Sequence, residues 1–117
     1  MKKMIEFQVP MHVNSKTGRR TKKVRYETRK GTPVTLTARG RNILAAVQEN
    51  DALVHVASGM VIARLADIRL EFAVRTGDLK HVLSVQTAAQ MAWDRLCVRY
   101  GTDVIFQKID AAPVINP

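Results

Sequence analysis

The chain has 117 residues, a single cysteine (Cys97) and a formal net charge of +9. This length suits one domain of ordinary size, which can bury a core without a disulfide or a structural metal. No apolar run approaches the roughly 20 residues of a membrane-spanning helix, and no apolar segment follows Lys2 and Lys3 as in a secretory signal. We therefore expect a cytoplasmic protein.

The positive charge is concentrated in the first third of the chain. Residues 1–42 hold twelve basic and two acidic side chains, whereas residues 43–117 hold seven basic and eight acidic ones. Eight of the basic side chains fall between Lys16 and Lys30. A segregated patch of this kind attracts polyanions, with nucleic acid as the first candidate.

The N-terminal region predicts a β-hairpin. Apolar and polar residues alternate over residues 4–13, which is typical of a half-buried strand, and Pro10 favours an edge position. The segment 14–18 has turn composition, and residues 21–30 alternate again. We expect Val24, Tyr26 and Thr28 on an apolar face and Lys23, Arg25, Glu27 and Arg29 on an opposite, cationic face.

The middle of the chain predicts a helix and a short meander. Gly31-Thr32-Pro33 should end the second strand, and a helix is expected over about 36–50, with Leu36, Gly40, Ile43, Leu44 and Val47 on one stripe. A hairpin is expected around the turn at residues 57–59. Alternation over 68–75 predicts a further strand, and a helix over 60–75, capped by Ser58 and stopped by Gly77, is the competing interpretation.

The last third predicts a long helix and a final strand. Thr87 and Gln90 form a capping-box pattern at the start of a helix that reaches Tyr100, and Gly101 should stop it. A strand is expected over 104–109. The whole is an α+β fold, a single domain over 1–110 in which an antiparallel sheet packs with two helices, followed by a tail over 111–117.

No pattern in the chain indicates a particular reaction. The three histidines, His12, His55 and His81, fall in separate elements, and Cys97 lies beside a predicted apolar stripe, as an inert thiol would. Asp67 and Glu71 could together hold Mg²⁺ for phosphodiester cleavage, but the interleaved arginines make surface ion pairs the simpler interpretation. We expect no catalysis, no metal and no cofactor.

Arg39 and Arg41 would stand in the first turn of the expected helix, where the helix dipole disfavours cations and a phosphate would compensate. The run from Leu36 to Leu44 resembles the opening of the first helix in some winged-helix and helix-turn-helix regulators. No recognition helix follows Asn50, so the resemblance implies no function.

We therefore predict a small non-catalytic protein of bacterial, phage or mobile-element type that binds nucleic acid, DNA rather than RNA, mainly through phosphates. Because Tyr26 should face the apolar side, duplex binding is favoured over stacking on single strands. The alternative is an assembly module whose hairpin meets an acidic protein surface, with self-association through the edge strand 4–13. The predicted contact residues are Lys16, Arg19, Arg20, Lys22, Lys23, Arg25, Arg29, Lys30, Arg39 and Arg41.

Overall fold

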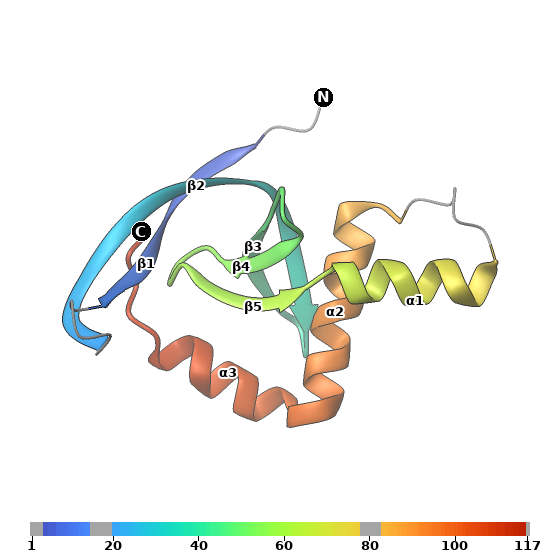
Figure 1. Cartoon of the computed structure of the whole chain (residues 1–117). Helices are drawn as coiled ribbons and strands as arrows, with labels where there is room; N and C mark the ends of the chain where they lie inside the picture. Colours follow the sequence, from blue (N-terminus) through green and yellow to red (C-terminus); the bar gives the residue numbers. More distant parts are fainter. Residues whose placement is uncertain (1–3, 15–19, 78–82, 117) are drawn as a thin grey trace.

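Five antiparallel strands form one sheet in which the spatial order of the strands is also their order in the chain (Figure 1). The structure is a computed structural model that describes residues 4–14, 20–77 and 83–116, without the side chains of 12–14 and 20–24. The strands are β1 (Ile5–Asn14), β2 (Arg20–Ala38), β3 (Arg41–Gln48), β4 (Ala52–His55) and β5 (Met60–Arg64).

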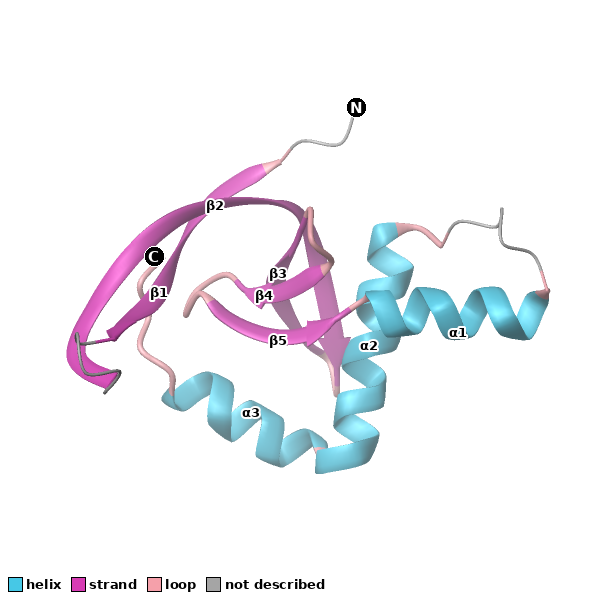
Figure 2. Ribbon diagram, in the orientation of Figure 1, coloured by secondary structure: helices cyan, strands magenta, loops and turns pink. Residues whose placement is uncertain are grey.

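Three helices follow the strands in the described chain: α1 (Ala66–Thr76), α2 (Val85–Tyr100) and α3 (Thr102–Ala111) (Figure 2). This arrangement confirms the predicted α+β class, with one helix more than the sequence indicated. The predicted N-terminal hairpin is also confirmed, because β1 pairs with β2 from Ile5 opposite Gly31 to Asn14 opposite Arg20. The predicted turn lies within residues 15–19, outside the described residues, apart from Asn14.

The prediction that Gly31-Thr32-Pro33 ends the second strand is wrong. Gly31 pairs with Ile5 on one side and with Gln48 on the other, and a Cβ there would lie 3.0 Å from the carbonyl oxygen of Val47. Glycine therefore permits the close approach of β3 at this point. Pro33 is tolerated because β1 begins opposite Gly31, so that within the described residues no strand lies beside Pro33 on that edge of β2.

The predicted helix over 36–50 is also wrong. The end of β2 and β3 form a hairpin there, and its turn residues Arg39 and Gly40 both have positive φ angles, 48° and 75°. Two positive φ angles define the tight turn whose twist suits a hairpin. Leu44, which the helical stripe counted as core, is 53% exposed, whereas Leu36 and Ile43 are buried on the same face. The apolar residues of two alternating strand segments, separated by this turn, happen to fall at the spacings of three and four residues that are typical of a helix.

The predicted strands over 68–75 and 104–109 are helices α1 and α3. Alternation misled in both places because short apolar segments fit both periods. In α1 only Ile68 is buried, and Gly77 ends the helix with a φ of 69°, as the competing interpretation expected. In α3 the packed side chains are Ile105, Phe106 and Ile109, a helical spacing.

The predicted long helix is confirmed as α2, with Gly101 at its end. Its cap is not the predicted pair of Thr87 and Gln90, because the Ser84 hydroxyl accepts the hydrogen bond from the Thr87 amide. The helix lays one face on the sheet and buries Ala88, Ala89, Ala92 and Trp93 against side chains that include Leu36 and Leu53. This layer is the main core.

A second, smaller core lies on the other face of the sheet, which curls over it. Phe7 and Val9 of β1 pack there with Ala46, Val54 and Val56. The curl brings β1 so close to the β4–β5 turn that a Cβ on Gly59 would lie 2.4 Å from the carbonyl oxygen of Gln8. Only glycine fits there.

The segment after α3 joins these two parts of the sheet. The Asn116 side chain accepts a hydrogen bond from the Gln8 amide (2.7 Å) and donates to the carbonyls of Gln8 (2.9 Å) and Val56 (2.6 Å). The amides of Ile115 and Asn116 also donate to the carbonyl of Ala57. Residues 115–116 thus close the gap between β1 and the β4–β5 turn.

Candidate nucleic-acid interface

The strands β1 and β2 form a long curved ribbon on the side of the molecule opposite α1 (Figure 1). Residues directly opposite each other in antiparallel strands point to the same face. Arg29 lies opposite Phe7, Glu27 opposite Val9 and Arg25 opposite Met11. Because Phe7 and Val9 are buried in the smaller core, Arg25, Glu27 and Arg29 share the concave face of the ribbon with them.

Tyr26 lies on the convex face, opposite Pro10, and it is 53% exposed. The prediction that Tyr26 faces the apolar side is therefore wrong. The apolar set of β1 and the cationic set of β2 were assigned to opposite faces, whereas the register places them on the same face. That register depends on the pairing of the two strands, which composition alone does not determine.

The two acidic residues of the ribbon are both paired with its cations. Glu27 accepts hydrogen bonds from Arg25 (3.1 Å) and from Arg29, its neighbours two positions away on the same face. Glu6 and Lys30 form an exposed ion pair at 3.6 Å. Both acids thus lie in the half of the ribbon that starts where Ile5 lies opposite Gly31 (the open half).

Three of the remaining predicted cations belong to the start of β2, in the half of the ribbon where Asn14 lies opposite Arg20 (the closed half). Lys16 and Arg19 lie outside the described residues. Arg20, Lys22 and Lys23 are part of β2, and their side chains are outside the described part of the chain. The segment between Lys16 and Arg25 contains no acidic residue.

Arg39 and Arg41 lie at the other end of β2, beside the β2–β3 turn, and both contact α3. Arg39 pairs with Asp103, and Arg41 makes a two-pronged pair with Asp110, with one contact at 3.0 Å. The guanidinium of Arg41 also stacks 4.8 Å from the ring centre of Phe106. The hydrogen bond from Arg41 lowers the pKa of Asp110. Since no helix starts at Leu36, the dipole argument for a phosphate here does not apply.

The structure therefore divides the predicted contact residues into two groups. Of the described residues, six lie on the β1–β2 ribbon, and Arg39 and Arg41 attach α3 to the β2–β3 turn. A strand of 19 residues separates the two ends, which corresponds to roughly 60 Å of contour length. The ribbon alone is the candidate interface for a polyanion.

Glu71 and His55, two of the residues considered for a reaction, have ordinary partners. Glu71 pairs with Arg95 from the neighbouring helix α2, and this hydrogen bond lowers the pKa of Glu71. Nδ1 of the buried His55 lies 2.8 Å from the Ser58 hydroxyl inside the β4–β5 turn, and burial lowers the pKa of His55. Within the described ranges, no three His, Cys, Asp or Glu side chains are grouped as metal ligands.

One feature of the interface was not predicted, namely the exposed ring of Tyr26. The residue is visible in the sequence, but the face it occupies follows only from the register with β1. No family model, no characterised protein and no solved structure matches the chain. None of the helices in the described ranges is long and apolar enough to span a membrane.

Proposed function

We propose that the protein binds nucleic acid through the closed half of the β1–β2 ribbon, with duplex DNA as the first candidate ligand. One observation carries this proposal: residues 5–38 hold eight cations and two acids, and both acids already pair with described cations, Glu27 with Arg25 and Arg29 and Glu6 with Lys30. The segment from Lys16 to Lys23 holds the other five cations and no acid in the sequence. A dense like-charge cluster costs stability unless an anion offsets it.

The shape of the ribbon is compatible with this role. A two-stranded ribbon fits the major groove of B-form DNA, and arginine makes two-pronged contacts with phosphates and guanine edges. The side chain of Arg25 is 70% exposed and shares Glu27 with Arg29, so two cations compete for one carboxylate. The group of two arginines and one glutamate therefore keeps a net positive charge that a phosphate can neutralise.

A salt titration tests the proposal. If about five phosphates are neutralised, the logarithm of the affinity should fall with log salt at a slope of about −4.5, or roughly 500-fold between 50 and 200 mM salt. Fluorescence anisotropy with a labelled duplex measures this slope. The absence of binding to duplex or single-stranded probes at low salt would refute the proposal.

A charge-matched pair of variants tests the location. Lys22→Gln with Arg25→Gln removes two ribbon cations, and the slope should become shallower by about 1.8. Arg75→Gln with Arg99→Gln removes two cations from exposed positions on α1 and α2 and should leave the slope unchanged. Equal losses in both variants would mean that the net charge acts as a whole and that the ribbon has no special role.

Tyr26→Ala distinguishes duplex from single-stranded nucleic acid. An aromatic platform contributes about 1–3 kcal/mol per stacked base to the binding of single strands. We expect the variant to bind duplex DNA as the parent protein does. A loss confined to single-stranded probes would reassign the ligand to single strands.

The second candidate partner is an acidic protein surface. With such a partner, the complex should survive nuclease treatment, and its affinity should drop when Lys22→Gln and Arg25→Gln are introduced. Self-association through residues 4–13 would in addition have to displace Asn116 from the edge of β1 at Gln8. Light scattering of the Asn116→Ala variant would reveal such an association.

A further inference from the structure

We propose that the free edge of β5 is a second interaction site, which takes an extended, acidic and apolar polypeptide segment as an additional strand. β5 stands at the other end of the strand order from β1, although the curl of the sheet brings Met60 and Val61 beside Pro10 and Met11 of β1. The proposal does not depend on nucleic-acid binding. The argument starts from how the chain treats its other open strand edges.

Unpaired strand edges are normally protected, because their free amide and carbonyl groups template further pairing. Beyond Gly31 one edge of β2 has no neighbouring strand in the described part of the chain, and α2 covers it at Thr35 and Thr37. The side-chain amide of Gln86 accepts from the Thr35 amide (2.9 Å) and donates to the Thr35 carbonyl, and Gln90 does the same with Thr37. Two side chains thus replace a strand.

The outer edge of β1 is protected in the same way. Asn116 bonds both the amide and the carbonyl of Gln8. Pro10, two residues further on, shares the outward orientation of Gln8 and has no amide hydrogen to offer. Neither of these edges is open to a partner strand at the positions covered.

β5 has no such protection among the described residues. It pairs only with β4, and no described side chain bonds to the backbone of Val61–Arg64. The strand also exposes apolar side chains that a partner could cover, since Met60 and Val61 are 37% and 49% exposed. A short apolar edge without covering groups favours strand addition.

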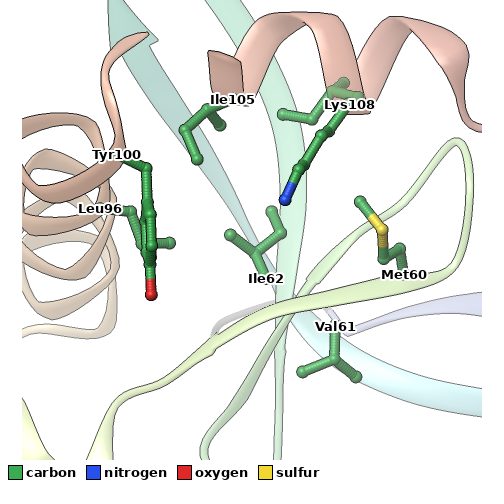
Figure 3. A pocket seen from close by; sticks show the side chains of 8 residues that line it. Met60, Val61, Ile62, Leu96, Tyr100, Ile105 and Lys108 are labelled. Carbon is green, nitrogen blue, oxygen red and sulfur yellow. The ribbon is translucent and has the colours of Figure 1, made fainter.

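A hollow beside β5 provides the specificity that strand addition needs. It has a volume of about 340 Å³ and lies between β5, the end of α2 and α3 (Figure 3). Its walls are mainly apolar, with Ile62, Leu96 and Ile105 among them. Alternate residues of an added strand point to one face, so one apolar side chain of the partner would enter this hollow.

The charge at the hollow indicates the chemistry of the partner. The amino group of Lys108 points into the space between Ile62 and Ile105 in Figure 3. Neither Lys108 nor Arg64, at the end of β5, belongs to an ion pair formed by described residues, whereas Arg41 on β3 and Arg95 on α2 each pair with a carboxylate. A segment with acidic residues flanking its apolar one would pair with these two cations.

The test uses the full chain, labelled with ¹⁵N, and short synthetic peptides in which valine alternates with glutamate and threonine. The peptides differ only in the central apolar residue, and an N-methylated version of each cannot donate backbone hydrogen bonds. We expect amide shifts at Met60–Arg64 with the plain peptides and none with the N-methylated ones. Lys108→Glu should weaken binding about three- to fivefold, and the matched Arg75→Glu on α1 should not.

Three results would overturn the proposal. The first is no shift with any peptide at millimolar concentration. The second is binding that N-methylation leaves unchanged, which would make the hollow a site for small apolar acids instead of a strand edge. The third is self-association of the chain through β5, seen as a concentration-dependent dimer whose interface includes Met60–Arg64.

Discussion

Replacement of Asn116 by alanine should open the junction between β1 and the β4–β5 turn. The side chain makes three hydrogen bonds that connect Asn116 with Gln8 and Val56, at distances from 2.6 to 2.9 Å. A typical hydrogen bond contributes about 0.5–1.5 kcal/mol net. The junction is only partly buried, so water replaces some of the loss, and we expect the free energy of unfolding to fall by about 2 kcal/mol.

The loss is measurable by urea denaturation. With a slope of about 2 kcal/mol per M, the midpoint should fall by about 1 M. Asn116→Asp should be more harmful than Asn116→Ala, because a carboxylate would then face the carbonyl oxygens of Gln8 and Val56. Hydrogen exchange of the Gln8 amide should accelerate in both variants.

Asn42→Ala is the matched control. Asn42 is exposed and accepts one hydrogen bond, from the Thr37 hydroxyl, so its loss should change the free energy of unfolding by less than about 0.5 kcal/mol. If Asn116→Ala were no more harmful than this control, or if Asn116→Asp were milder than Asn116→Ala, the bridge would not hold the sheet closed. The account of the tail would then be wrong.

Two further predictions concern the helices. Gln86→Ala combined with Gln90→Ala removes four hydrogen bonds to Thr35 and Thr37 and should uncover the free edge of β2. Because an uncovered edge templates pairing between molecules, we expect concentration-dependent aggregation in light scattering. Circular dichroism should show little change in secondary structure. Asp110 has a lowered pKa in the folded state, so its stabilising effect is present above the unfolded pKa of about 4 and is lost as the pH falls through the folded value. Asp110→Asn should therefore flatten the acid side of a plot of urea midpoint against pH, and an unchanged acid side would contradict the role of the pair with Arg41.

The sequence by itself determined the elements whose signals are local. Ten alternating residues predicted β1, turn residues at 57–59 predicted the β4–β5 hairpin, and a long apolar stripe ending at Gly101 predicted α2. The segregation of charge is also a property of the sequence, since it requires only a count along the chain. These features could be predicted because their signals lie in residues that are close together in the chain.

Tertiary structure decided the elements whose sequence fits two periods. Between Leu36 and Val47, the apolar residues satisfy both a helical and an alternating spacing, and the turn at Arg39 and Gly40 selects the strands because β3 can then pair on both sides. Near α1 and α3, the neighbouring helix α2 supplies the surface on which a helical face packs. Short segments take the period that their surroundings can bury.

Tertiary structure also decided which cations are available to a ligand. Arg39 and Arg41 are distant in the sequence from Asp103 and Asp110, so no local pattern predicts that α3 occupies them. The face of Tyr26 depends on the register between β1 and β2, and a shift of one residue would reverse it. The count of charges is thus fixed by sequence, but which of them face a partner is fixed by pairings between distant segments, because only these bring an acid or a strand edge within bonding distance.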